Sequence, residues 1–150
     1  MRAVVTRVQS ASVAIDGNVC GKIGHGFLVL LGVAPEDTPL HTRKLAEKIL
    51  GLRVFRDEED KMNLSLSDVG GSVLVVSQFT LYADCSHGRR PSFIGAAAPE
   101  KANALYEQFL SECAALGFPP QHGEFGAYMQ VTSQNDGPVT LILDTRELKL

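Results

Sequence analysis

The sequence predicts an α/β fold, built as a single domain over residues 1–150. Several short apolar stretches are rich in β-branched residues, as strands are. One of them, Gly70–Ala83, contains an aliphatic run at residues 73–76 that is typical of a strand buried on both faces. Two longer stretches, opened by Pro39 and Pro99, repeat apolar residues at helical spacing. A chain of 150 residues can bury a sizeable core within one domain.

Composition and charge argue against several classes of protein. The formal net charge of −3 disfavours non-specific nucleic-acid binding by the whole surface, although it is compatible with a local basic patch. The cysteines are far apart and form no CxxC pair, which fits a reducing cytosol better than a disulfide framework or a structural zinc site. The first residues lack the apolar core of a signal peptide, and no apolar run is long enough to span a bilayer. We therefore expect a cytoplasmic protein with no membrane segment, no metal and no cofactor.

The N-terminal part of the chain predicts a series of strands. Residues 3–15 alternate between the two faces of a strand, Asp16-Gly17 is a tight-turn signal, and residues 19–23 form the returning strand. Residues 27–33 are a further candidate for a buried strand. Arg7 places a charge within the first strand, and two interpretations stay open. It is either a solvent-facing guard of an edge strand or an inward guanidinium that braces a backbone carbonyl.

The first helix is predicted to begin at Pro39, directly after the capping pair Asp37-Thr38, and to end near Gly51. Residues 52–55 have the character of a short strand. The acidic residues 57–60 that follow indicate a solvated turn, because a metal loop needs regularly spaced ligands and a glycine.

Polar side chains follow the apolar run of the central strand. Ser77, Gln78 and Thr80 lie at its far end, still with strand character, where α/β proteins tend to bind ligands. The same side chains can also satisfy a strand terminus by local hydrogen bonds, so both interpretations stay open. A threonine hydroxyl is a poor nucleophile unless a base takes its proton, whereas backbone N–H groups at a strand end can stabilise an oxyanion.

A loop at residues 84–99 connects this strand to the second helix, and its length favours a functional or mobile segment. Arg89 and Arg90 are the densest basic point of the chain and suit bidentate contact with phosphate, although most such pairs are simply solvated. In the helix that follows, Cys113 falls on the apolar stripe and is expected to be an inert buried thiol.

The C-terminal part predicts two more strands. Residues 123–131 have strand character, with small residues beside Phe125 that leave room for a ligand or another backbone. Asn135-Asp136-Gly137 is a turn signal ahead of a final strand at residues 141–143. An X-Pro bond is cis in only about 5–6% of cases, so the residues alone favour a trans bond at Pro138.

Two motifs carry a resemblance to a known family. Ser77-Gln78-Phe79-Thr80-Leu81 and Asn135-Asp136-Gly137-Pro138-Val139-Thr140 resemble the two signature motifs of the D-aminoacyl-tRNA deacylases of bacteria and eukaryotes. Further segments agree: Thr6-Arg7-Val8, Lys61-Met62-Asn63-Leu64, Arg90-Pro91-Ser92-Phe93 and the stretch from Phe125 to Val131. The similarity spans nearly the whole chain in the right order, and neither motif departs from the family pattern.

The resemblance implies a fold, an assembly and a reaction. The fold is a single compact domain with a mixed, strongly curved β-sheet and two main helices, which forms a homodimer through the sheet with active sites at the subunit interface. The enzyme binds the 3′ end of aminoacyl-tRNA and hydrolyses the ester of a D-amino acid, and it also acts on glycine. Water is the nucleophile, assisted by the substrate's own ribose hydroxyl, and no metal is needed.

The resemblance also implies the site. Ser77, Gln78, Phe79 and Thr80 are the expected catalytic residues and line the pocket, with the Phe79 amide as oxyanion donor. The expected substrate-binding residues are Arg7, Phe125, Ala127, Met129, Gly137 and Pro138. Within this set the Gly137-Pro138 bond is cis and enters the partner's pocket, where its carbonyls hold the substrate amino group and exclude L side chains. Arg7 braces that motif, and Phe125 and Met129 border the adenine site.

Two other functions remain open from the residues. One is a hydrolase of small acyl esters that uses Thr80 or Cys85 as nucleophile, with His87 as a weak candidate base for the thiol. The other is a module that binds RNA ends without turnover through Arg89 and Arg90.

Overall fold

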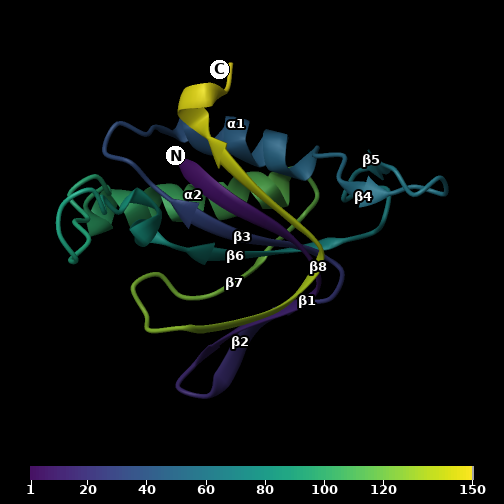
Figure 1. Ribbon diagram of the computed structural model, residues 1–150, viewed down its shortest axis with the longest axis horizontal. Coiled ribbons are helices and arrows are strands. Elements are labelled where there is room, and N and C mark those ends of the chain that lie inside the picture. Colours follow the sequence, from purple (N-terminus) through teal and green to yellow (C-terminus); the bar gives the residue numbers. More distant parts are fainter. Residues whose placement is uncertain (150) are drawn as a thin grey trace.

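A mixed sheet forms the centre of the structure, a computed structural model that describes residues 1–149 (Figure 1). Its six strands are β1 (Arg2–Ile15), β2 (Asn18–Ile23), β3 (Gly26–Gly32), β6 (Ser72–Ser77), β7 (Gln121–His122) and β8 (Gln130–Asp144). The order is β2-β1-β3-β6-β7, with β8 on the opposite edge of β1. Strand β1 is antiparallel to β2, β3 and β8, whereas β3, β6 and β7 are parallel.

The sheet curls strongly because the long strand β1 uses its two halves for different neighbours. Its first half pairs with β3 and its second half pairs with β2. The curl brings β2 against β7, where a Cβ added to Gly21 would lie only 2.8 Å from the carbonyl oxygen of His122. The expected mixed and strongly curved sheet is therefore confirmed.

Two helices, α1 (Pro39–Leu50) and α2 (Pro99–Ala115), cover one face of this sheet (Figure 1). The larger core lies between them and the sheet and includes Val73 and Val75 of β6. A smaller core inside the curl includes the alternate residues Leu74 and Val76. The central strand is thus buried on both faces, as its four successive aliphatic residues predict. No helix within residues 1–149 has the length and apolar character needed to cross a membrane.

The ends of the first helix follow the sequence signals. Thr38 is the N-cap and forms a capping box with His41, Pro39 is the first helical residue, and Gly51 is the C-cap. Beyond α1, a small hairpin of β4 (Phe55–Arg56) and β5 (Met62–Leu64) encloses the acidic turn. The expected strand over residues 52–55 is wrong, because only its last residue enters this short hairpin.

The central strand ends earlier than its sequence predicts. Strand β6 stops at Ser77, and the 3-10 turn η1 (Phe79–Tyr82) follows it. The backbone N–H of Gln78 makes the last hydrogen bond to β3, to the Leu31 carbonyl oxygen at 2.8 Å. The hydrogen bonds that follow are within the turn itself. Leu81 donates to Gln78 at 3.2 Å and Ala83 donates to Thr80 at 3.0 Å, so turn bonding replaces the expected extension of the strand.

The expected strand over residues 123–131 is mostly wrong. Residues 124–127 form a turn in which the Ala127 amide donates to the Glu124 carbonyl at 3.2 Å. Gly126 has a φ of +81°, a left-handed conformation that glycine adopts readily and that ends an extended run. Regular pairing with β1 begins only at Gln130.

The Asn135-Asp136-Gly137 signal marks a bulge in one long strand rather than a turn between two. Strand β8 is continuous through this segment, with Thr140 opposite Thr6 and Asn135 opposite Val8. The four residues 136–139 therefore face Arg7 alone and protrude from the ladder. The Gly137-Pro138 peptide bond is cis, as the resemblance implies and against the expectation from proline alone.

Candidate functional site

The end of β6 and the turn that follows it hold four of the predicted site residues: Ser77, Gln78, Phe79 and Thr80. Ser77, Gln78 and Thr80 are half-buried, whereas the Phe79 side chain is 56% exposed. The Gln78 side-chain amide donates a hydrogen bond to the Thr80 hydroxyl, which fixes both side chains on the same side of the turn. The structure thus brings these residues together as one short, ordered segment.

Two residues that the sequence did not single out hold this turn in place. A Cβ on Gly32 would lie 3.1 Å from both the Gln78 carbonyl oxygen and the Leu81 Cβ, so the close approach of η1 to β3 depends on glycine. Arg2 donates to the Leu81 carbonyl oxygen at 2.7 Å, and its guanidinium lies 4.7 Å from the centre of the Tyr82 ring. Gly32 carries a weak signal, as a glycine at the end of an apolar strand; Arg2 carries none.

The first amides of the turn are available to a ligand. Within residues 1–149, the N–H groups of Phe79 and Thr80 have no hydrogen-bond acceptor, since the first donors of a helical turn lack a partner inside it. The exposed Phe79 ring packs edge-on against Phe93, with ring centres 5.2 Å apart. Two adjacent N–H donors at an accessible edge can stabilise a developing negative charge on a carbonyl oxygen.

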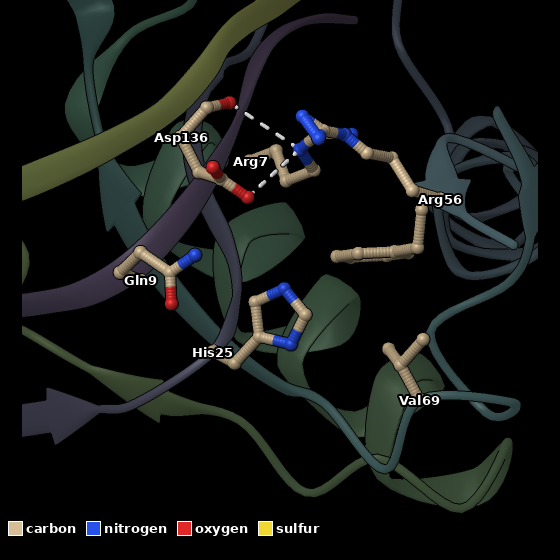
Figure 2. A pocket seen from close by; sticks show the side chains of 7 residues that line it. Arg7, Gln9, His25, Arg56, Val69 and Asp136 are labelled. Carbon is tan, nitrogen blue, oxygen red and sulfur yellow. Dashed lines mark hydrogen bonds and ion pairs between the residues drawn. The ribbon is translucent and has the colours of Figure 1, made fainter. Parts of the chain in front are cut away.

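Arg7 lies behind the bulge of β8 and points inward, so its interpretation as a solvent-facing guard is wrong. Its side chain is only 4% exposed. Nη1 donates to the Val54 carbonyl oxygen at 2.6 Å, and Nε donates to the Asp136 carbonyl oxygen at 3.3 Å. Nε also lies 3.2 Å from the Asp136 carboxylate, and Figure 2 shows both contacts to Asp136. Arg7 therefore ties the start of the bulge to the body of the domain.

A hollow of about 260 Å³ opens beside this brace (Figure 2). The residues that line it are Arg7, Gln9, His25, Phe55, Arg56, Val69 and Asp136. The His25 ring stands edge-on against Phe55, with ring centres 5.1 Å apart. Gly137 follows the lining residue Asp136 directly, with a φ of +120°, and a Cβ there would come 3.0 Å from an Arg7 guanidinium nitrogen.

Phe125 and Met129 lie on opposite faces of the sheet near the end of β6. Phe125 packs against the Tyr106 ring, with centres 6.1 Å apart, and the Tyr106 hydroxyl donates to the Val75 carbonyl oxygen at 3.1 Å. Met129 packs against the smaller core, which contains Val76. Ala127, in the turn between them, is half-buried.

The Gly137-Pro138 segment does not lie at the Ser77 end of its own sheet. Ser77 of β6 pairs with Leu31 of β3, and Leu31 pairs with Ala3 of β1. The bulge of β8 faces Arg7, which is four residues beyond Ala3 along β1. That offset amounts to about 13 Å along the strand direction, and the three strand spacings from β8 to β6 add about 14 Å across it. The two predicted parts of the site are therefore roughly 20 Å apart along the sheet of one chain.

Cys85, one of the two alternative nucleophiles, gains no partner from the structure. Cys85 and His87 are both exposed, and neither makes a hydrogen bond within the described part of the chain. Cys113 is buried, and burial raises the pKa of its thiol to about 12, which agrees with its prediction as an inert thiol. Among residues 1–149, no group of three or more His, Cys, Asp and Glu side chains is placed to hold a metal ion.

Comparison with known proteins gives full-length matches. The family model described as D-Tyr-tRNA(Tyr) deacylase matches residues 4–144. A D-aminoacyl-tRNA deacylase of Desulfatibacillum aliphaticivorans is 58% identical over 146 residues, which cover 97% of this chain and 100% of that protein. The solved structure of a c-Myc DNA unwinding element binding protein matches with a TM-score of 0.90 at 44% identity, over 96% of this chain and 98% of that one.

A more distant structure shows the same fold. A probable eukaryotic D-amino acid tRNA deacylase matches with a TM-score of 0.82 at 17% identity, over 95% of this chain and 97% of that one. The arrangement of one curved sheet and two helices is therefore shared over nearly the whole length of both chains.

Proposed function

The chain belongs to the D-aminoacyl-tRNA deacylase family, and we propose on this basis that it hydrolyses the ester between a D-amino acid and the terminal ribose of tRNA. Water adds to the ester carbonyl, the bond from the carbonyl carbon to the ribose oxygen breaks, and free D-amino acid and tRNA leave. The family match over residues 4–144 is the observation that carries this proposal. Because aminoacyl-tRNA is used in translation, the reaction takes place in the cytoplasm.

Backbone amides supply the catalysis in this proposal. As water attacks, negative charge develops on the carbonyl oxygen, and the N–H groups of Phe79 and Thr80 can bind it because no acceptor within residues 1–149 occupies them. The Gln78–Thr80 hydrogen bond and the close packing on Gly32 hold the turn rigid, so little reorganisation is needed. The aminoacyl ester is already activated, and the neighbouring hydroxyl of the substrate ribose assists the attack.

Chirality is read by a backbone wall from a second copy of the chain. The bulge at Gly137-Pro138 lies roughly 20 Å along the sheet from its own Ser77, so it is better placed to reach the turn of another protomer. Its carbonyl oxygens bind the amino group of the substrate, and this backbone leaves no room for the Cβ of an L-amino acid. Glycine has no Cβ, so glycyl-tRNA is also hydrolysed.

The outer edge of β8 supports a homodimer. Within residues 1–149 this strand pairs only with β1, which leaves the backbone groups of its other edge unpaired along fifteen residues. Apolar side chains on the strand are also uncovered, with Ile142 72% exposed and Val131 40% exposed. Sedimentation at micromolar concentration is expected to give twice the chain mass of 16.2 kDa; a monomer mass would contradict the shared site.

The Thr80→Ala variant separates backbone catalysis from a hydroxyl nucleophile. We expect it to keep most of its kcat on D-aminoacyl-tRNA, because the proposed oxyanion donors are amides that the substitution leaves in place. Gln78→Ala removes the same Gln78–Thr80 hydrogen bond but keeps the hydroxyl. Complete loss of turnover in Thr80→Ala but not in Gln78→Ala, both with unchanged circular dichroism, would instead assign the nucleophile to the Thr80 hydroxyl.

A further inference from the structure

The loop between η1 and α2, at residues 84–98, is tied closely to the proposed reaction site and lies near the start of α2 in Figure 1. Asp84 and Ser92 form an antiparallel bridge, with backbone hydrogen bonds of 2.7 and 2.9 Å in the two directions. Directly after the bridge, Phe93 packs edge-on against Phe79 of the turn. The end of the loop that leads into α2 is also fixed, since the Ala97 backbone N–H donates to the Val33 carbonyl oxygen at 2.9 Å.

Arg89 and Arg90 stand at the tip of this anchored loop. Both are exposed, and neither takes part in an ion pair or a side-chain hydrogen bond within residues 1–149. Asp84 is the only acidic residue of the loop, and its carboxylate already accepts from the amide and hydroxyl of Ser86. Those bonds hold the pKa of Asp84 below its usual range, with the side-chain bond from Ser86 as the larger cause. The ionised Asp84 lies in the bridge at the base of the loop, so Arg89 and Arg90 leave the loop tip locally cationic in a chain whose net charge is −3.

The geometry limits how far these charges can lie from the reacting ester. Arg90 is two residues from Ser92, so its backbone is within about 7 Å of the bridge, and the bridge adjoins the Phe79–Phe93 contact. A substrate ester at the Phe79 amide thus has its next nucleotides within reach of the two guanidinium groups. Two forked donors side by side match consecutive backbone phosphates, which guanidinium groups bind in bidentate fashion.

We propose that Arg89 and Arg90 bind the phosphates of the single-stranded 3′ end of tRNA, just upstream of the aminoacylated nucleotide. This inference rests on the proposed deacylase function and assigns a subsite to it. The contacts carry no base information, so they hold every tRNA alike and position the ester rather than select the sequence. They act on substrate capture, because the phosphates that they bind do not change during the reaction.

The test compares two substrates and two charge-matched variants. Arg89→Ala/Arg90→Ala removes two cations at the loop, and Arg43→Ala/Lys22→Ala removes two exposed cations on α1 and β2. Each is assayed on D-aminoacyl-tRNA and on D-aminoacyl-adenosine, which lacks the upstream phosphates. We expect the kcat/KM of the loop variant on D-aminoacyl-tRNA to fall about tenfold, because its KM rises. Its kcat/KM on D-aminoacyl-adenosine should stay unchanged. The control variant keeps both activities.

Salt dependence gives a second readout. Between about 50 and 200 mM salt, the logarithm of kcat/KM on tRNA should fall less steeply for the loop variant, by a slope difference of about 1.4 for two lost single-strand phosphate contacts. Equal losses on both substrates, or a loop variant that matches the control, would overturn the phosphate subsite while leaving deacylation intact. An unmodified protein that hydrolyses neither substrate would instead overturn the proposed function.

Discussion

Replacement of Arg7 tests how the bulge at Gly137-Pro138 is held. Arg7→Met keeps an apolar chain of similar length but removes the guanidinium that bridges Val54 and Asp136. The carbonyl of the buried Val54 then loses its donor at 2.6 Å, and the Asp136 carbonyl and carboxylate lose theirs at 3.3 and 3.2 Å. The bulge keeps the strand pairing on either side of it but loses its polar link to the body of the domain.

The magnitude follows from burial. An unsatisfied buried carbonyl costs about 1–3 kcal/mol. The ion pair adds roughly 1 kcal/mol, because the Asp136 side chain is 30% exposed and screened by water. With the bond to the Asp136 carbonyl, the free energy of unfolding should fall by about 3–5 kcal/mol, or on the order of 10 °C in Tm for a domain of this size. Arg7→Lys should lose about half as much, since one ammonium cannot serve both partners.

The assay is thermal unfolding at one fixed protein concentration, together with rates on D- and L-aminoacyl-tRNA. We expect Arg7→Met to unfold at lower temperature and to hydrolyse L-aminoacyl-tRNA several-fold faster relative to the D form, because the proposed chiral wall at Gly137-Pro138 is no longer braced. Arg56→Met is the matched control, since Arg56 lines the same hollow but is 57% exposed. An Arg7→Met protein that behaves like this control in both measurements would refute the bracing role.

Three further predictions concern the turn and the cysteines. Gly32→Ala brings a Cβ within 3.1 Å of the Gln78 carbonyl oxygen and should lower kcat/KM at least tenfold by displacing the turn. The control Gly24→Ala, with no atom within 4 Å of the added Cβ, should leave kcat/KM unchanged. Equal kcat/KM values for the two variants would show that the turn tolerates the shift. At pH 8, iodoacetamide should leave Cys113 unlabelled until the protein is unfolded, because burial raises the pKa of its thiol to about 12 and keeps it protonated. Labelling of the exposed Cys85 should leave deacylation unchanged, and inactivation in step with its modification would favour a thiol nucleophile.

Much of the fold could be predicted because its signals are local. The aliphatic run at residues 73–76 required burial on both faces, and the two cores on either side of β6 supply it. The predictions failed in segments whose structure depends on which strand they can pair with. Residues 123–129 contain strand-forming residues but no neighbour to pair with until Gln130, and Gly126 turns the chain before that point.

The candidate site residues could be named from the sequence, but their arrangement could not be predicted. The motifs named Ser77–Thr80 and Gly137-Pro138, yet periodicity alone continued the central strand through residues where local turn bonds win. The inward direction of Arg7 depends on a bulge across the sheet that no local pattern reveals. Gly32 and Arg2 hold the turn through contacts that are distant in sequence, so only the folded chain identifies them.

Hydrolysis of the same tRNA charged with the D or the L form of one amino acid tests the central claim most directly. With purified protein, we expect the D-aminoacyl ester to be cleaved rapidly, the glycyl ester to be cleaved as well, and the L-aminoacyl ester to survive. Equal rates on the two mirror forms would contradict a wall of backbone that reads handedness, whatever residues perform the hydrolysis.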